Sequence, residues 1–294
     1  MTSTAAAARA AAETSPDLNS DPHAFTIYAS SIAMFGRCPS QWHYRYVEGL
    51  KIPPNGAMFA GTCYHRGLES NFSQKMESKE DLEIERVLAT ASDRFDRQIA
   101  NDHDTGILQE VDVDWGKDED KGRLKDDLMN MTSLYMATQA PSIMPEKVEH
   151  KATKLLAVLG KGNYYCLGGT ADLITRTGDK TIIIDHKLTS SRSFLLRQDE
   201  ADKDLQATAY CLLNNINDFS FHLALRGKGG HRIEIMKTHR SKDEISWFEN
   251  GILRPMVKAL EYDLFPKNPT GWWCQQQRCG YSELCRPHAK NIAV

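Results

Sequence analysis

Two aspartates and a lysine mark the ends of two apolar stretches that a tight turn joins. The turn is Gly178-Asp179, a two-residue signal for a β-hairpin, because glycine supplies the positive φ that such turns need. Counted outward from that turn, Asp172 lies directly opposite Asp185. Lys187 shares a face with Asp185, because side chains two apart in a strand point the same way. The pattern therefore predicts two facing carboxylates with an ammonium beside them.

Two carboxylates that face each other on a sheet repel, and a cation between them removes the repulsion. Mg²⁺ and Mn²⁺ are the natural candidates, because hard ions bind carboxylate, water and phosphate oxygens. An ammonium beside them can stabilise a developing anion or position a water, so these groups together suit hydrolysis of a phosphodiester. The alternative is a solvated hairpin with scattered charges. The facing register and the apolar run Ile182-Ile183-Ile184 before Asp185 argue for the site.

The elements that must position these residues form an α/β pattern. Strands expected at 154–159, 164–176 and 180–187 make an antiparallel meander, and further strands are expected at 219–226 and 231–238. Helices are expected from Ser30 or Ser31 onward, at 57–71, at 203–214 and at 242–262. Strands flanked by helices predict a central mixed β-sheet. The resulting single domain would span residues 24–294 after a tail of residues 1–23, with a helical lobe at about 79–145, a core at about 146–240, and a C-terminal helix with a cysteine cluster at about 241–286.

Four further polar residues lie in or beside these elements. Glu149 lies just before the meander and adds a carboxylate. Gln206 and Tyr210 are one helical turn apart and so share a flank of the helix at 203–214. His65 lies inside the helix expected at 57–71, where a lone histidine is more often structural unless it faces a site.

Three cysteines crowd the C-terminal region in the spacing Cys274-x4-Cys279-x5-Cys285. Three thiolates need a fourth ligand, and Cys38 is the candidate, although it also fits a helical core pattern. The remaining cysteines, Cys63, Cys166 and Cys211, fall in apolar contexts and are expected to be small buried residues. Four thiolates suit either a 4Fe–4S cluster or a structural Zn²⁺, and the spacing leaves the choice open.

The totals limit the classes of function. A net charge of −3 gives no general basic field, so binding to nucleic acid would depend on a local groove. Candidates for it are Arg192, Arg197, Arg226, Lys228 and Arg232, each of which is equally well explained as ordinary surface charge. No apolar run approaches the length of a membrane span. Seven cysteines without a secretory leader suggest a reducing compartment, the cytoplasm of a prokaryotic or phage-infected cell.

The order of these motifs resembles the RecB-type branch of the PD-(D/E)XK nucleases. The residues that carry the resemblance are Cys38, His65, Glu149, Gly169-x-x-Asp172, Asp185-x-Lys187, Gln206-x-x-x-Tyr210 and Cys274-x4-Cys279-x5-Cys285. Each motif is short, but their joint order, with one cysteine before the core and three after it, is specific. Within that branch the chain is most similar to iron–sulfur members, namely CRISPR adaptation nucleases, AddB-type nuclease domains and phage RecB-like exonucleases. Residues 79–140 carry none of the resemblance.

The resemblance implies a restriction-endonuclease-like core with a helical insertion, and roles for the residues in it. Asp172 and Asp185 would bind Mg²⁺ or Mn²⁺, helped by His65 and the backbone carbonyl of His186. Lys187 would activate the attacking water. Gln206, Tyr210 and Glu149 would complete the catalytic set. A 4Fe–4S cluster on Cys38, Cys274, Cys279 and Cys285 would staple the N-terminal and C-terminal segments together.

The expected activity is that of a metal-dependent DNA exonuclease or end-processing nuclease on single-stranded DNA, with a recombination, repair or CRISPR-adaptation protein as partner. The second acidic residue is Asp185, where many relatives carry glutamate, and no helicase motif of the form G-x4-G-K-[ST] occurs. The main alternative is a DNA-binding or assembly subunit with the same fold that cuts poorly without a partner. A zinc-stapled binding protein without nuclease activity is a further alternative.

Overall fold

The computed structural model describes residues 24–101, 108–117, 120–159, 163–190, 194–227 and 230–286. The expected tail of residues 1–23 lies outside these ranges, as do Arg192 and Lys228 of the expected basic groove. The strands are β1 (Ala24–Tyr28), β2 (Ile99–Asn101), β3 (Leu108–Glu110), β4 (Pro145–Leu159), β5 (Asn163–Thr177), β6 (Lys180–Ser190), β7 (Asp218–Arg226) and β8 (Arg232–His239). The α-helices are α2 (Ile32–Arg37), α3 (Pro39–Tyr46), α4 (Gly56–Ser78), α5 (Ile84–Arg97), α6 (Lys121–Thr138), α7 (Gln198–Asp202), α8 (Leu205–Asn214), α9 (Lys242–Phe248), α10 (Arg254–Tyr262) and α11 (Ser282–Cys285).

Six strands form one mixed sheet in the order β1-β5-β6-β7-β8, with β4 on the outer edge of β5. The pairs β1–β5 and β6–β7 are parallel, whereas β4–β5, β5–β6 and β7–β8 are antiparallel. The predicted mixed sheet flanked by helices is therefore confirmed. Three details of the prediction are wrong: strand β1 was not expected, the region expected to be helical contains the antiparallel pair β2–β3, and β4 begins at Pro145 instead of Lys154, so that Glu149 lies within it.

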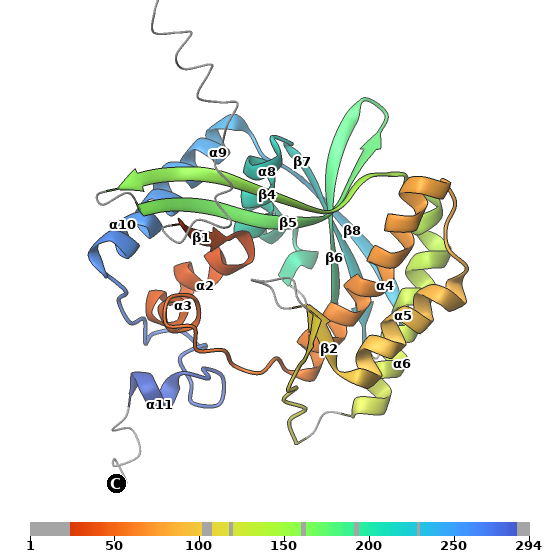
Figure 1. The fold of residues 1–294 in the computed structure, drawn as a ribbon, viewed down its shortest axis with the longest axis horizontal. Coiled ribbons are helices and arrows are strands. Elements are labelled where there is room, and N and C mark those ends of the chain that lie inside the picture. The colour runs from red at the N-terminus through yellow and green to blue at the C-terminus, as the bar shows by residue number, and fades with distance from the viewer. Residues whose placement is uncertain are drawn as a thin grey trace, which may run out of the picture.

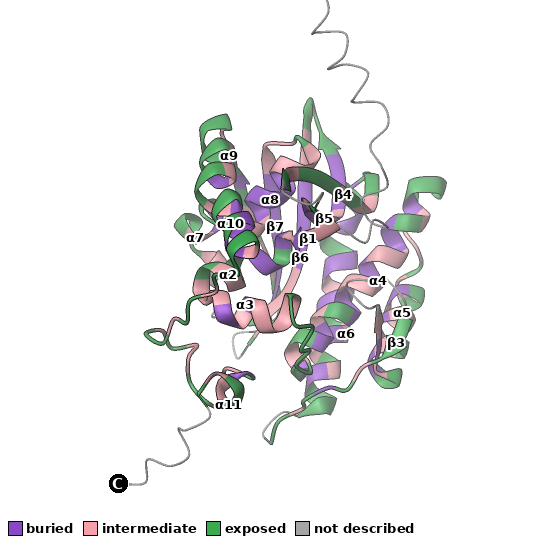
Figure 2. Cartoon of the chain, turned by 60° about the vertical axis from the view of Figure 1, so that its left-hand side comes forward, coloured by how far each residue is buried: buried purple, intermediate pink, exposed green. Residues whose placement is uncertain are grey.

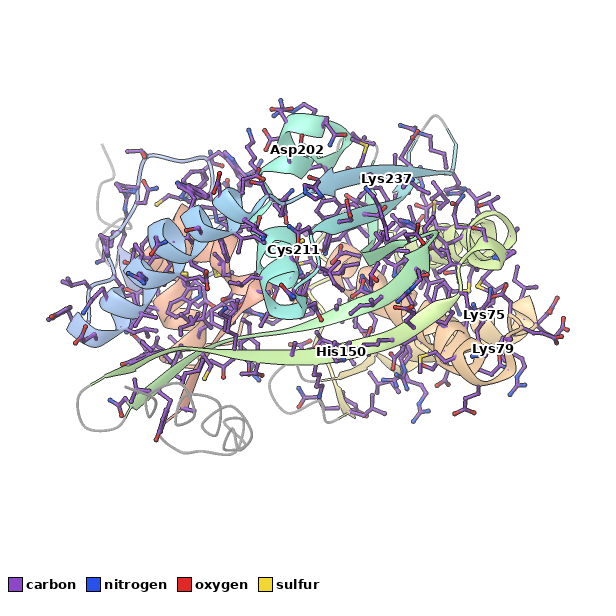
Figure 3. All side chains as sticks on the ribbon, turned by 90° about the horizontal axis from the view of Figure 1, so that it is seen from above. Lys75, Lys79, His150, Asp202, Cys211 and Lys237 are labelled. Carbon is purple, nitrogen blue, oxygen red and sulfur yellow. The ribbon has the colours of Figure 1, made fainter. Side chains whose placement is uncertain are left out.

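Helices cover both faces of the sheet (Figure 1). On one face α8 and α10 share one hydrophobic cluster with the odd-numbered residues of β7, among them Phe219 and Phe221. On the other face α4, α5 and α6 pack around Tyr135 and Phe72 in a second cluster, which also takes in Leu173 of β5. Figure 2 shows both buried layers, and Figure 3 shows Cys211 of α8 near the middle of the molecule and Lys75 of α4 towards one end. No helix in the described ranges is long and apolar enough to cross a membrane.

The hairpin that carries the two aspartates has the predicted register. Its turn has Gly178 at φ 62°, Thr177 pairs with Lys180, and the ladder continues outward to Leu173 opposite Ile184. Asp172 and Asp185 are the next position, where the ladder stops. From Gly168 back to Tyr164, β5 pairs with β1 instead of β6. Strands β1 and β6 thus pair with different parts of the same edge of β5, and β4 pairs with the opposite edge. The two aspartates lie at the fork where β1 and β6 separate.

Gly169 lies at the same fork and lets α8 approach β5 closely. A Cβ atom at this position would meet Cε1 of Tyr210 at 2.8 Å and Cδ1 of Leu213 at 3.1 Å. Both contacts are shorter than packed carbon atoms tolerate, so a methyl group here would have to push α8 outward.

We expect the substitution Gly169→Ala to displace Tyr210 and to lower the free energy of unfolding by about 1–3 kcal/mol, the usual cost of overpacking. Thermal melts would measure the loss. Gly36→Ala is the matched control, because no atom lies within 4 Å of the added Cβ there. Equal melting of both variants would show that the close approach of α8 is not constrained.

Candidate active site

Asp172 lies at the fork, where it contacts two histidines. Its Oδ2 accepts a hydrogen bond from the backbone N–H of His186 at 2.8 Å and lies 3.1 Å from Nδ1 of His65. His65 reaches the site from α4, so it faces the aspartates. Burial alone would raise the pKa of Asp172, but His65 and His186 hold it well below its usual range. Asp172 is therefore a carboxylate that stays ionised.

Asp185 is the more deeply buried of the two aspartates, with 2% of its surface exposed. Nζ of Lys187 donates to its Oδ1 at 3.1 Å and lies 2.9 Å from its Oδ2. That Oδ2 has no hydrogen-bond partner among the described residues. Burial raises the pKa of Asp185 to about 6, the Lys187 ammonium opposes the rise, and the charge of Asp172 adds to it. The two aspartates therefore differ sharply in acidity.

Gln206 and Tyr210 of α8 complete a chain of contacts that starts at Lys187. The lysine ammonium donates to Oε1 of Gln206 at 3.3 Å, and Nε2 of Gln206 donates to the Tyr210 hydroxyl at 3.2 Å. Helix α8 begins here because the Asp204 carboxylate accepts from the backbone N–H of Ala207 and so caps its first turn. Through Gln206, the helix thereby holds the Lys187 ammonium in addition to its contact with Asp185. The lysine side chain stays 30% exposed.

Glu149 belongs to the same group of charges. It lies in β4 between the pairs Val148–Leu173 and His150–Ala171, which is the position opposite Asp172. Its φ of 47° is left-handed, an uncommon conformation for a residue with a side chain. Burial raises the pKa of Glu149 to about 8, and the charges of Asp172 and Glu69 add to the effect. A strained backbone thus holds a third carboxyl group beside the aspartates.

This carboxyl group should make stability fall as the pH rises. Between pH 4.5, the ordinary pKa, and about pH 8, the folded chain keeps a proton that the unfolded chain has lost. The stabilisation is therefore complete at low pH and is lost as the pH rises through 8. We expect Glu149→Gln to be about 2–4 kcal/mol more stable than the wild type at pH 9 in EDTA, and equal to it at pH 5. Melts of the exposed-residue control Glu146→Gln should show no such trend, and a pH-independent effect at Glu149 would contradict the assignment.

Sequence reasoning missed two buried residues behind the aspartates. The Tyr135 hydroxyl of α6 lies 2.9 Å from Nε2 of His186 and 2.7 Å from Nδ1 of His222. Burial lowers the pKa of His222 to about 3, so this imidazole is neutral. No motif marks Tyr135, because it lies in the helical lobe, and His222 reads as one polar residue in an apolar strand.

The donor chemistry of the aspartate group fits a hard divalent cation. The buried Oδ2 of Asp185, which accepts no hydrogen bond from the described residues, supplies a carboxylate oxygen, and Asp172 supplies another. The N–H of His186 points to Asp172, and because the N–H and C=O of a strand residue point to the same edge, its carbonyl faces the fork as well. Over the described part of the chain, no three His, Cys, Asp or Glu side chains stand close enough to hold an ion by themselves. This arrangement suits Mg²⁺, which usually takes one or two carboxylates and completes its shell with water and substrate phosphates.

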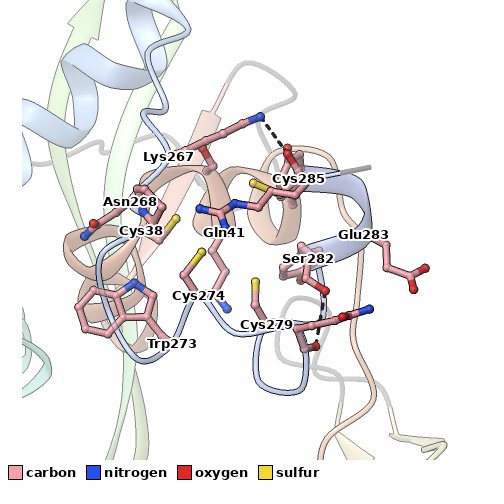
Figure 4. A pocket seen from close by; sticks show the side chains of 16 residues that line it. Cys38, Gln41, Lys267, Asn268, Trp273, Cys274, Cys279, Ser282, Glu283 and Cys285 are labelled. Atoms are coloured by element: carbon pink, nitrogen blue, oxygen red, sulfur yellow. Dashed lines mark hydrogen bonds between the residues drawn. The ribbon is translucent and has the colours of Figure 1, made fainter. Parts of the chain in front are cut away.

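The four cysteines of the predicted ligand set line one cavity of about 460 Å³ between α3 and the C-terminal segment. Figure 4 shows the sulfur atoms of Cys38, Cys274, Cys279 and Cys285 directed into it. Burial raises the pKa of Cys279, and the other three thiols raise it further, so the four interact. All four are free thiols, and they are not gathered tightly enough to form a ready-made ligand group within the described residues. Cys63, Cys166 and Cys211 are buried elsewhere, as predicted.

Hydrogen bonds already join the two chain segments around this cavity. The Ser40 hydroxyl donates to the Phe265 carbonyl at 2.6 Å, and the Asn268 amide donates to the Arg37 carbonyl at 2.8 Å. The Tyr281 hydroxyl similarly reaches the carbonyl of Leu50 at 2.7 Å. Direct hydrogen bonds thus connect the N-terminal helices to the C-terminal segment.

The described members of the expected basic groove contact acidic neighbours. Arg226 lies 3.9 Å from Asp127, Arg232 contacts Glu234 at 2.9 Å, and Arg197 pairs with Glu200. These pairs reduce the positive charge that is available to a polyanion.

Comparison with known proteins adds the family. Residues 27–286 match the family model of the PD-(D/E)XK nuclease superfamily. A presumed exonuclease from Eubacterium rectale has a similar fold, with a TM-score of 0.50, 12% identity, and coverage of 92% of this chain and 89% of that chain. An alkaline exonuclease from Laribacter hongkongensis gives a TM-score of 0.27 at 14% identity, over 44% of this chain and 63% of that chain. No curated protein sequence matches the chain.

Proposed function

The chain belongs to the PD-(D/E)XK nuclease superfamily, and we propose on that premise that it is a metal-dependent deoxyribonuclease that hydrolyses phosphodiester bonds of single-stranded DNA or of DNA ends. One observation carries the proposal. A buried carboxylate oxygen of Asp185, which accepts no hydrogen bond from the described residues, is ion-paired with the ammonium of Lys187 and lies at the same fork as the ionised Asp172. Burying two carboxylates beside one ammonium costs free energy, and a bound divalent cation would offset that cost.

In the proposed site each residue has a distinct task. Asp172 and Asp185 hold Mg²⁺ or Mn²⁺, with His65 and the backbone carbonyl of His186 beside them. The bound ion lowers the pKa of a water and offsets charge on the phosphate. Lys187 orients the attacking water, and Gln206 with Tyr210 holds Lys187 in place. Glu149 adds a third carboxyl group, which burial keeps protonated near neutral pH when no ion is bound.

We further propose that the chain is a RecB-type member with a 4Fe–4S cluster on Cys38, Cys274, Cys279 and Cys285. The support is that all four line one cavity between the two chain segments, in a spacing that is unlike the paired C-x2-C of common zinc ribbons. The cluster takes no part in hydrolysis and acts as a staple, with a structural Zn²⁺ as the alternative ligand. If anaerobically isolated protein contains iron and acid-labile sulfide, the cluster is supported. Stoichiometric zinc without iron would instead support the structural Zn²⁺ site.

The exposed parts of Lys187 and His65 mark the side from which a DNA strand reaches the fork. The pairing of Arg197, Arg226 and Arg232 makes them weak candidates for a groove, so strand binding would depend mainly on the site itself and on a protein partner in recombination, repair or CRISPR adaptation. The chain would act as one nuclease domain over residues 24–294, in the cytoplasm.

A second candidate function follows from the loose arrangement of the metal-binding side chains. Because no three of them are gathered among the described residues, the chain could serve as a DNA-binding or assembly subunit whose site a partner completes. Cleavage assays separate the two functions. Product that depends on Mg²⁺ or Mn²⁺ supports the nuclease, and DNA binding without product under either metal supports the subunit.

A further inference from the structure

Behind the aspartates lies a buried chain of polar contacts that the proposed hydrolysis does not use. It runs from His222 of β7 to Tyr135 of α6, then to His186 of β6, whose Nδ1 lies 3.5 Å from Oδ2 of Asp172. The side chains of His222, Tyr135 and His186 are all buried between the sheet and the helical lobe. Three separate elements therefore meet at a carboxylate of the proposed site.

The chemistry of the groups favours one assignment of donor and acceptor along this series of contacts. An ionised carboxylate only accepts hydrogen bonds, so the 3.5 Å approach of Nδ1 of His186 to Asp172 favours a proton on that nitrogen. A neutral imidazole then has a bare Nε2, which needs a donor, and the Tyr135 hydroxyl is the group within reach. That hydroxyl has one proton, so towards His222 it can only accept, and Nδ1 of His222 must be protonated as well.

The Tyr135 hydroxyl selects one of two orientations of the His186 ring that packing alone would allow. The His186 ring stacks on Phe72 with centroids 5.9 Å apart, and this contact fixes the plane of the ring. Stacking does not distinguish the ring from one turned by a half rotation, which would exchange Nδ1 for a carbon atom beside Asp172. The hydrogen bond from Tyr135 to Nε2 does distinguish them, because the turned ring would lose it.

We propose that Tyr135 is a positioning residue of the lobe: through His186 it orients the Asp172 carboxylate for the divalent cation. The inference rests on the proposed function, because it assigns Asp172 to a metal. It also gives the helical lobe, which carries no sequence motif of the family, a role in the site. Groups that hydrogen-bond to metal-binding side chains commonly change metal affinity by roughly 10–100-fold when they are removed.

The test compares two tyrosine variants by calorimetric titration of Mn²⁺ without nucleic acid. Tyr135→Phe removes the bridging hydroxyl, and we expect Mn²⁺ to bind about tenfold more weakly. Tyr64→Phe is the matched control, because Tyr64 is also fully buried and packs edge-on against Tyr135, but its hydroxyl has no partner among the described residues. Its Mn²⁺ affinity should be unchanged. Equal affinities of the wild type and Tyr135→Phe would overturn the inference.

A second measurement needs no folded variant of Tyr135. Long-range ¹H–¹⁵N spectra of the wild-type protein report histidine tautomers, and the signals of interest are assigned by their loss in His186→Gln and His222→Gln. Both rings should be protonated at Nδ1, and a proton on Nε2 of His186 would overturn the inference. Neither readout uses cleavage. Absence of Mn²⁺ binding by the wild type would overturn the proposed function together with this inference, whereas unchanged affinity in Tyr135→Phe overturns the inference alone.

Discussion

The substitution Asp185→Asn should lower the rate of DNA cleavage about a thousandfold and leave the fold intact. An amide keeps the shape of the carboxylate but loses the charge and one of the oxygen ligands that a divalent cation needs. Metal-ion catalysis contributes several kcal/mol to phosphodiester hydrolysis, and about 1.4 kcal/mol corresponds to a factor of ten in rate. The fold should survive because the amide relieves the burial that raises the pKa of Asp185, while Lys187 keeps its bond to Gln206.

Two variants make this loss interpretable. Asp179→Asn removes a carboxylate from the exposed turn of the same hairpin and should cleave at the wild-type rate. Asp185→Glu restores the carboxylate with one more methylene group and should retain measurable activity, because the charge and both oxygen ligands return. Melting curves and single-turnover cleavage of all three variants would be compared. Cleavage by Asp185→Asn at the wild-type rate would rule out the assigned metal site.

The substitution Cys279→Ala should destabilise the protein more than any change at the aspartates. Cys279 lies in the cavity with Cys38, Cys274 and Cys285, and the proposed metal centre on all four would tie the N-terminal helices to the C-terminal segment. Because metal-binding free energy is also folding free energy, and structural metals supply about 10 kcal/mol or more, losing one ligand should lower the melting temperature by at least about 10 °C. Anaerobic circular dichroism melts would measure the shift.

Metal content supplies the independent readout for this variant. The wild type should show broad absorbance near ~400 nm, with iron and acid-labile sulfide, and Cys279→Ala should lose both. Cys166→Ala is the control, because this thiol is fully buried in the sheet and lines no part of the cavity. It should cost about 1 kcal/mol for the lost packing and keep the full metal content. Unchanged melting of Cys279→Ala would rule out a ligand that joins the two ends.

The hairpin could be predicted because its signal is local. Gly178-Asp179 sets the turn, the turn sets the register, and the register places Asp172 across from Asp185 without knowledge of any other element. The placement of Gln206 and Tyr210 on one flank of α8 follows from helical periodicity in the same way. His65 was placed on a helix, but only the fold shows that this helix turns it towards Asp172.

The remaining features depend on contacts between residues far apart in the chain. Strand β1 pairs with β5 across more than a hundred residues, and its five residues carry no turn signal of their own. The first half of β4 was missed because its many charged residues hide the strand pattern, so the left-handed Glu149 opposite Asp172 could not be foreseen. Tyr135 and His222 meet His186 only because the lobe packs on the sheet, which no sequence spacing reports.

The most direct test of the account is cleavage of 5′-labelled and 3′-labelled DNA, single-stranded and double-stranded, by anaerobically purified protein in Mg²⁺, Mn²⁺ or EDTA. The account predicts product with either metal and none in EDTA, and the pattern of labelled fragments would give the polarity of digestion. DNA that is bound but uncut under every metal would contradict the nuclease assignment and would leave the assembly subunit as the function of this fold.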